Sequence, residues 1–284
     1  MTFGASIHAL TDFEHDVRPF HEALNLVREA GCSYIMLFSH PRGPVLRPEA
    51  RPEASLLNLL DSHTRTVRWA VHDAGLELAV LYSGGLEVSE EGTLAASLDL
   101  LKRARDCALS LGATHLAVNA GRAPAPGLPT EQKRDLIDRL AHICSTAMEG
   151  YTAVRLGVDL HYHSPIETVA DAEYFLSQTE NPVGVLLNIG HLTTCRQAGW
   201  ELAARHPARL PIVGWKDHRL DAPQPVFSVQ LGTGDSPLEK YAQQLKYDNV
   251  ERRHIIAFEH VPFADKPRAL RRSLEYLQAL WGQV

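Results

Sequence analysis

The sequence contains only four cysteines, and none of them forms a Cys-x-x-Cys pair. This wide spacing is typical of reduced thiols and disfavours a disulfide framework or a cysteine-bound zinc cluster. The sequence also lacks an apolar run long enough to span a membrane, and its first residues lack the pattern of a signal peptide. We therefore expect a soluble, cytoplasmic protein without a membrane partner.

The sequence also has no excess of basic over acidic residues. The 284 residues carry a formal net charge of −6, which disfavours nucleic acid as a partner. Hydrophobic residues make up 45% and charged residues 22% of the chain, as in a globular protein with a substantial core. Two small domains would fit this length, but one α/β barrel of about 250 residues fits equally well.

Short apolar runs alternate with segments of helical periodicity along the whole chain. Strands are expected at residues 3–10, 33–39, 76–82, 114–119, 154–163, 183–188, 212–217 and 254–259. Helices are expected at residues 17–30, 56–74, 94–111, 130–149, 166–178, 197–205, 237–245 and 266–280. This alternation predicts a (β/α)8 TIM barrel, a single domain over residues 1–284. A doubly wound sheet is the alternative, disfavoured because the chain has no glycine-rich dinucleotide fingerprint.

Polar clusters close the last four predicted strands. They are His161-Tyr162-His163, Asn188-Ile189-Gly190-His191, Lys216-Asp217-His218 and Glu259-His260. A parallel barrel gathers the carboxyl ends of its strands around one cavity, so these side chains are expected to form an active site with imidazoles and carboxylates. Because side chains alternate along a strand, Asp159, His161 and His163 should share one face, as should Gly214, Lys216 and His218.

Glu259 is the strongest single candidate, because a carboxylate after an apolar run is costly to bury unpaired. A lone histidine near a strand end is usually structural, but four histidine-bearing strand ends in succession favour a shared site. Lys216 and Asp217 could equally form an ion pair that braces the seventh strand. Cys195 has no evident activating base and is interpreted as an inert thiol.

These motifs, together with Gly232-Thr233-Gly234, resemble those of the xylose-isomerase-like barrels, which include sugar isomerases, epimerases and inosose dehydratases. The resemblance follows the order of elements over the whole chain, and its specific motifs lie between about residues 154 and 260. It implies a divalent metal site at the positions of His161, Asn188, Gly214 and Glu259. Two of these positions have lost the usual ligand type, since a neutral amide binds metals weakly and glycine offers no side chain.

His218 lies on the predicted face of Gly214 and could replace the missing imidazole. A site built from His161, His191 or His163, His218 and Glu259, with Asn188 beside it, would suit Mn, Zn, Co, Fe or Ni. The resemblance implies metal-assisted proton transfer next to the carbonyl of a sugar or cyclitol. It also makes a homo-oligomer one expectation, since related proteins are often dimers or tetramers.

In this hypothesis Glu259 is a metal ligand and base, His161 a ligand, His191 a ligand or acid, and Lys216 the partner of the oxyanion. Contacts with the substrate are expected from His8, His40, Asn119, His163 and Asp217. The alternative is a non-catalytic sugar-binding barrel that has lost part of its metal site. A phosphodiester-cleaving barrel of the same fold is disfavoured by the acidic charge.

Overall fold

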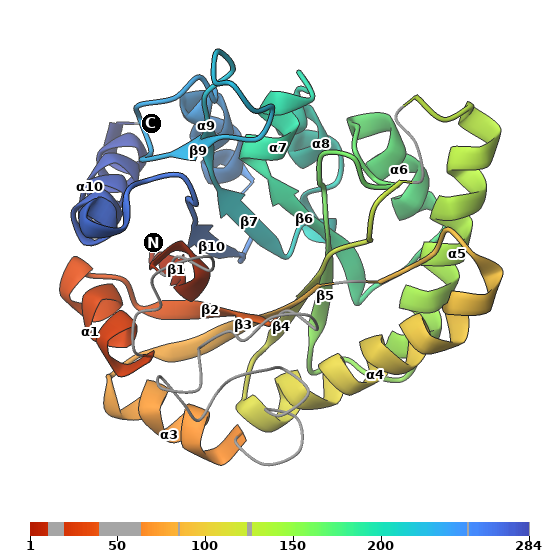
Figure 1. Ribbon diagram of the computed structural model, residues 1–284, viewed down its shortest axis with the longest axis horizontal. Coiled ribbons are helices and arrows are strands. Elements are labelled where there is room, and N and C mark those ends of the chain that lie inside the picture. Colours follow the sequence, from red (N-terminus) through yellow and green to blue (C-terminus); the bar gives the residue numbers. More distant parts are fainter. Residues whose placement is uncertain (11–19, 40–63, 85, 124–126, 249, 284) are drawn as a thin grey trace.

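Eight parallel strands close into a barrel, which confirms the predicted (β/α)8 fold (Figure 1). The computed structural model describes residues 1–10, 20–39, 64–84, 86–123, 127–248 and 250–283. The strands follow one another around the barrel in the order β1-β10-β7-β6-β5-β4-β3-β2. Their bounds are β1 (Gly4–Ser6), β2 (Tyr34–Ser39), β3 (Glu77–Ser83), β4 (His115–Val118), β5 (Arg155–Asp159), β6 (Val183–Asn188), β7 (Ile212–Trp215) and β10 (Arg253–Ile256).

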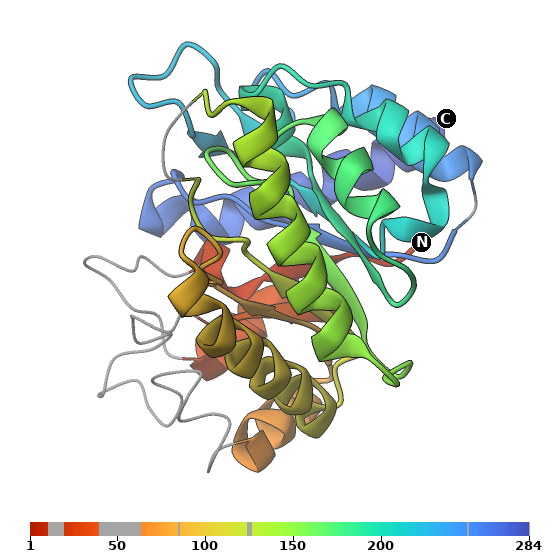
Figure 2. The same cartoon turned by 90° about the vertical axis from the view of Figure 1, so that its right-hand side faces the viewer.

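Helices surround the strands in both views of the ribbon (Figures 1 and 2). They are α1 (Phe20–Ala30), α3 (Thr64–Asp73), α4 (Leu94–Leu111), α5 (Thr130–Met148), α6 (Val169–Ser177), α7 (Ile189–Thr194), α8 (Gly199–Arg205), α9 (Leu238–Tyr247) and α10 (Lys266–Gln283). Glycine ends α4 as predicted, because Gly112 adopts a φ of 80° and its N–H bonds to the carbonyls of the last turn. None of the helices that the structure describes has the length and apolar character needed to cross a bilayer.

The core has two layers. One lies between the strands and the helices, and a smaller one fills the inside of the barrel with residues such as Tyr34, Val80 and Leu186. The two ends of the chain also pack together, since the rings of Phe3 and Trp281 lie 5.8 Å apart. This closure completes the barrel between β1 and β10, which pair in parallel.

Two strands end earlier than expected. β5 stops at Asp159, because the chain turns at once: Ser164 N–H bonds to the carbonyl of His161, and His163 has a φ of 59°. The expectation that His161 and His163 continue the strand face of Asp159 is therefore wrong.

β7 stops at Trp215, and the chain then forms a small antiparallel pair. Its strands are β8 (Asp217–His218) and β9 (Ser228–Val229). His218 thus belongs to a different sheet from Gly214, which overturns the expectation that both lie on one strand face. The short helix α7, which follows β6 directly, was also not expected from the sequence.

Candidate active site

A cavity of about 1270 Å³ opens at the carboxyl ends of the barrel strands. The strand alternation brings successive inward positions to it, as with Ile255, Ala257 and Glu259 at the end of β10. Of the residues expected at the site, the following line the cavity: Asn119, His161, His163, Asn188, His191, Lys216 and Glu259. The sequence pattern therefore predicted residues that line one cavity of the structure. The role of each residue has to be argued from its contacts.

The most direct contact between charged groups in the cavity joins Lys216 to Glu259. The Lys216 Nζ lies 2.7 Å from the Glu259 Oε1, and both side chains are partly buried, with exposed fractions of 15% and 26%. Ser228 on β9 contributes a hydroxyl that donates to the Glu259 Oε2, and the Glu259 backbone N–H donates to the same hydroxyl at 2.7 Å. A carboxylate held by an ammonium and a hydroxyl donor is favoured in its ionised form.

The floor of the cavity holds a second carboxylate, Asp159, which is only 2% exposed. Its Oδ2 accepts a hydrogen bond from the Tyr82 hydroxyl at 2.7 Å, and its Oδ1 accepts one from the Asn188 Nδ2 at 2.9 Å. Burial and the nearby Asp159 raise the pKa of Tyr82 well above its usual value, so this phenol stays protonated. Sequence reasoning placed Asp159 on the inward face but gave it no role, although a carboxylate ending an apolar strand was the available signal.

The orientation of Asn188 is fixed by this contact, because a carboxylate can only accept. Its Oδ1 is consequently left as a buried acceptor, and it has no hydrogen-bond partner among the described residues. A group that brings a donor to this oxygen would remove the cost of leaving it unpaired. The floor therefore contains one buried acceptor that the described residues leave unpaired.

His161 and His191 stack above the floor, with ring centroids 3.7 Å apart and planes tilted by 32°. His191 is 2% exposed, and burial holds its pKa well below the usual value, with smaller contributions from His161 and Lys216. Near neutral pH His191 is accordingly an uncharged imidazole. An uncharged ring can donate from one nitrogen and accept at the other.

His218 lies beside His191, with ring centroids 5.1 Å apart, and neither His218 nor Asp217 lines the cavity. His218 is fully buried, its Nδ1 lies 2.8 Å from the Thr194 hydroxyl, and burial lowers its pKa to about 3. The Asp217 carboxylate accepts the backbone N–H groups of Gly232, Thr233 and Gly234, as well as that of Ser236. The roles expected of these two residues, metal ligand and substrate contact, have no supporting contact and stay predictions.

The remaining candidates for contact with substrate are Asn119, His163, His8 and His40. Asn119 lines the cavity but uses its Oδ1 to accept the Gly121 N–H at 2.8 Å. His163 lines the cavity at the turn after β5. The side chain of His8 and the whole of His40 lie outside the described residues, so their expected contacts with substrate also stay predictions.

The donor set does not fit a divalent metal. Gly214 has no side chain, the neutral Asn188 amide oxygen is a weaker ligand than a carboxylate, and the ammonium of Lys216 already holds Glu259. Within the part of the chain that the structure describes, no three His, Cys, Asp or Glu side chains converge as a metal site would require. The described donor set therefore does not support the metal-assisted form of the hypothesis, which stays a prediction, and no step below passes through a metal.

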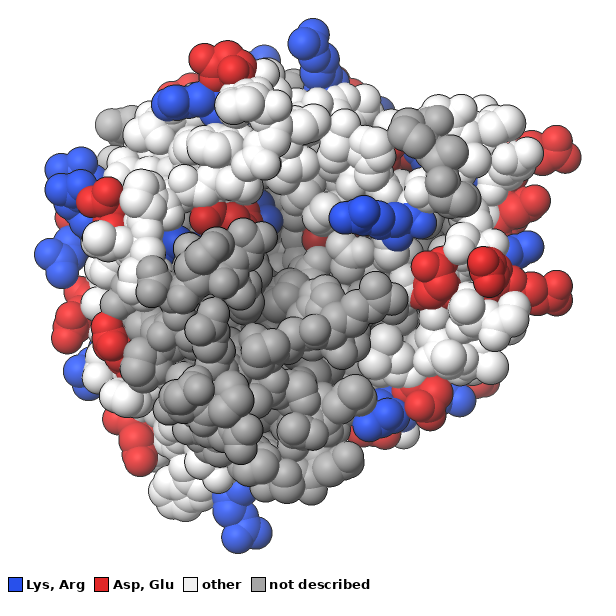
Figure 3. All heavy atoms as spheres, viewed as in Figure 1, with Lys and Arg blue, Asp and Glu red and all other residues white. Residues whose placement is uncertain are grey.

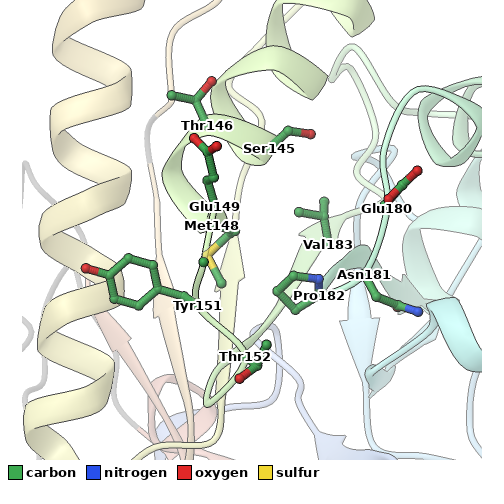
Figure 4. Close-up of a pocket in the computed structure, with 11 residues that line it drawn as sticks. Ser145, Thr146, Met148, Glu149, Tyr151, Thr152, Glu180, Asn181, Pro182 and Val183 are labelled. Atoms are coloured by element: carbon green, nitrogen blue, oxygen red, sulfur yellow. The ribbon is translucent and has the colours of Figure 1, made fainter.

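A second pocket, of about 390 Å³, lies where α5 ends and β6 begins (Figure 4). Its lining includes the carboxylates of Glu149 and Glu180 and no histidine, lysine or arginine. This is the amino-terminal end of the strands, which in TIM barrels serves stability, not catalysis. On the face drawn in Figure 3, basic and acidic side chains are interspersed, and neither sign forms a broad patch among the described residues.

Comparisons with known proteins agree with this architecture. Residues 24–280 match the model of a family described as xylose isomerase-like TIM barrel. None of the curated proteins matches the sequence. Three of the similar solved structures are an IOLI protein with a bound zinc atom, the 3-keto-D-glucoside 4-epimerase YcjR from E. coli, and a fusion of a xylose isomerase-like TIM barrel with 4-hydroxyphenylpyruvate dioxygenase.

The chain covers nearly the whole of the first two structures. For the IOLI protein the identity is 15% and the TM-score 0.77, with 100% of this chain and 99% of the other covered. For the epimerase the values are 17% and 0.72, with 98% and 99% covered. The fusion protein is 16% identical with a TM-score of 0.76, and 99% of this chain spans 43% of its length. At these identities the likeness establishes the fold alone.

Proposed function

This chain belongs to the xylose isomerase-like TIM barrel family, and from that premise we propose that it moves a proton next to the carbonyl of a sugar or cyclitol. The product would be an epimer, an isomer or, where a hydroxyl leaves, a dehydrated ketone. The observation that carries the proposal is the Lys216–Glu259 ion pair inside the cavity at the carboxyl ends of the strands. A carboxylate base beside a fixed cation is the pair of groups that enolate formation needs.

In the proposed reaction, Glu259 removes a proton from the carbon next to the carbonyl. The electron pair of that C–H bond moves to the carbonyl oxygen, which becomes an enolate oxyanion. Lys216 has three N–H donors, so it can hold Glu259 and stabilise the oxyanion at the same time. Return of the proton to the same carbon, on the opposite face, gives the epimer. For the isomer, the proton of the neighbouring hydroxyl passes to the oxyanion, and the proton held by Glu259 returns to the former carbonyl carbon.

The dehydration variant differs only in its last step. The enolate expels a hydroxyl from the next carbon, and that hydroxyl leaves as water after taking a proton. Polar groups on the floor of the cavity, such as the Tyr82 hydroxyl with its Asp159 partner, are candidates to deliver that proton. Whether the product is an epimer, an isomer or a dehydrated ketone depends on the substrate bound.

The proposal is tested by hydrogen exchange in D2O. The protein is incubated with a panel of keto-sugars and inososes, and NMR follows the loss of the proton next to each carbonyl. Glu259→Gln should slow exchange by about 100-fold or more, as expected when a general base is removed. Glu149→Gln, which removes a carboxylate from the pocket at the other end of the barrel, should leave the rate unchanged. Equal rates for the protein and Glu259→Gln on a substrate that does exchange would refute the role of Glu259.

A non-catalytic sugar-binding barrel is the second candidate, favoured by the replacement of two metal-ligand positions by Asn188 and Gly214. It predicts that a sugar of the panel binds with measurable heat while its protons never exchange. Binding without exchange would replace the catalytic proposal by this one.

A further inference from the structure

The hydroxyl of Ser228 on β9 contacts Glu259 at two points. It accepts the Glu259 backbone N–H at 2.7 Å and donates to the Glu259 Oε2. Lys216 holds the other carboxylate oxygen, Oε1. One fully buried hydroxyl therefore ties the main chain of Glu259 to the end of its own side chain, which restricts the rotation of the carboxylate.

Ser228 is itself held by His260, the residue after Glu259. The Ser228 backbone N–H donates to the His260 Nδ1 at 3.0 Å, and the His260 backbone N–H donates to the Ser228 carbonyl oxygen at 3.1 Å. The ring of Phe227 stacks on the ring of His260, with centroids 4.6 Å apart and planes 27° apart. These contacts join β9 to the chain that leaves β10, so the hydroxyl reaches Glu259 from a fixed backbone.

The hydroxyl of Ser228 has one hydrogen and two acceptors within reach, the Glu259 Oε2 and the His260 Nδ1. The Nδ1 lies 3.3 Å from the hydroxyl oxygen, but it already accepts the Ser228 backbone N–H at the shorter distance of 3.0 Å. An ionised carboxylate is also the stronger acceptor. The hydroxyl proton therefore belongs to the bond with Glu259, and the imidazole serves the backbone of Ser228.

We propose that Ser228 is the positioning residue of the base and that His260 keeps Ser228 in place. Proton abstraction requires the carboxylate to meet the C–H bond at a suitable distance and angle. With Lys216 on one oxygen and Ser228 on the other, the carboxylate is oriented before a substrate binds. The inference rests on the proposed function, in which Glu259 removes the proton, and it gives the small β8–β9 sheet a task in the reaction.

The role of Ser228 is tested by the exchange reaction in D2O, with kcat and KM measured separately on a substrate that exchanges. Ser228→Ala should lower kcat by about 10- to 100-fold, because a misoriented base loses the geometry of proton transfer. Its KM should change by less than about twofold, since the hydroxyl acts on Glu259 and not on the substrate. Ser228→Thr restores the hydroxyl and should recover most of the lost kcat.

The matched control is Ser236→Ala, which removes a hydroxyl that accepts the His218 backbone N–H and should leave kcat unchanged. A wild-type kcat in Ser228→Ala, or equal losses in the two alanine variants, would overturn the proposal. So would a Ser228→Thr variant that melts at the wild-type temperature but is as slow as Ser228→Ala.

A double-mutant cycle tests the part assigned to His260. If His260 acts through Ser228, His260→Ala lowers kcat in the wild type and has no further effect in the Ser228→Ala background. Losses that multiply in the double variant would show that His260 acts by another route, and the second half of the proposal would be rejected.

The contact of Ser228 with Glu259 is also tested without any activity, by infrared spectra of the full-length protein at a fixed, mildly alkaline pH. In each background, the carboxylate stretching bands of Glu259 are the difference between the protein and its Glu259→Gln form. These bands should shift in Ser228→Ala, which removes a donor from Oε2, and stay in place in Ser236→Ala. Bands that do not move in Ser228→Ala would overturn the assigned contact.

These results separate the inference from the proposed function. If the bands shift in Ser228→Ala while Glu259→Gln exchanges normally, Ser228 orients the carboxylate but the assigned base is wrong. If exchange depends on Glu259 while neither kcat nor the bands respond to Ser228→Ala, the catalytic proposal stands and the positioning role is rejected.

Discussion

The ammonium of Lys216 lies 2.7 Å from the carboxylate of Glu259, although 43 residues separate them in the sequence. The contact arises because β7 and β10 pair in parallel, with Gly214 opposite Ile255 and Trp215 opposite Ile256. Both residues therefore leave their strands at the same edge of the barrel. An ammonium placed here supplies the positive charge that a metal would otherwise bring to the glutamate.

Replacing Lys216 by methionine tests this electrostatic role. Lys216→Met keeps an unbranched side chain but removes the charge and the donors, so the developing oxyanion loses its stabilisation. Exchange of the substrate proton should slow by about 100- to 1000-fold. The rate is measured by NMR in D2O at saturating substrate, and the exposed lysine in the control variant Lys240→Met should not affect it.

The variant Lys216→Arg separates the effect of the positive charge from that of its geometry. It retains a cation but not the compact geometry of an ammonium, so its activity should lie between those of the wild type and Lys216→Met. A fully active Lys216→Met would show that the ion pair only braces the strand ends, which is the structural alternative.

Metal binding is expected to be weak in the wild type and to appear when the missing ligands are restored. In the variant Asn188→Asp/Gly214→His, a carboxylate and an imidazole would join Glu259. A Cβ at Gly214 would lie 3.3 Å from the Leu186 Cδ2, a flexible side-chain end that can give way. Calorimetry with Mn²⁺, Co²⁺ and Zn²⁺ should show at least tenfold tighter binding by the double variant.

Adding Lys216→Met to that variant should tighten binding further, because it removes the cation that competes for Glu259. Purification of the wild type with one tightly bound metal per chain would contradict this prediction. It would mean that the side chains rearrange around the ion and that the donor set fits after all.

The alternation of short apolar runs with segments of helical periodicity was sufficient to predict the barrel. The structure has α4 and β6 at the predicted bounds. It failed where a local turn overrides an apolar pattern. His161-Tyr162-His163 continues the β-like composition of β5, yet His163 adopts a φ of 59° and the chain turns away. The backbone of Tyr162 contacts the rings of His161 and His191, and these contacts depend on that turn, so no spacing rule could have revealed them.

Sequence reasoning about β7 failed for a related reason. Asp217 and His218 read as the end of a barrel strand, but they pair with β9, which lies ten residues further along the chain. The partner of Asp217 is the backbone of the glycine-containing loop, and backbone N–H groups leave no signal in the residue pattern. The conserved geometry of a parallel barrel predicted the cavity, whereas such local pairings required the coordinates.

Asp217 is expected to stabilise the loop that follows β9. Its buried carboxylate accepts four backbone N–H groups, those of residues 232–234 and 236. Asp217→Ala leaves these donors unpaired and should lower the free energy of unfolding by about 2–4 kcal/mol, measured by urea denaturation. Asp221→Ala, which removes a carboxylate that is 84% exposed, should change it by less than about 0.5 kcal/mol. A loss of the same size in both variants would contradict the assigned role.

The stability of the protein is expected to fall in mild acid because of buried histidines. His254 is 1% exposed, its Nδ1 accepts the Trp215 indole N–H at 3.0 Å, and burial lowers its pKa from 6.5 to about 3. Between these two values the unfolded chain binds a proton that the folded chain does not. The stabilisation is therefore complete above pH 6.5 and decreases as the pH falls, by about 1.4 kcal/mol per pH unit for each such histidine.

Substitution of His254 by glutamine separates this contribution from those of other groups. Glutamine keeps an acceptor for the Trp215 N–H but does not titrate, so the slope of the unfolding free energy between pH 6.5 and 5 should decrease by about 1.4 kcal/mol per pH unit. Urea denaturation at several pH values in this range measures the slope, and the exposed His72→Gln is the matched control. An unchanged slope in His254→Gln would mean that the folded protein protonates His254 as readily as the unfolded chain does. The added proton would then lie on the Nδ1, where the Trp215 indole N–H is a donor and offers it no acceptor.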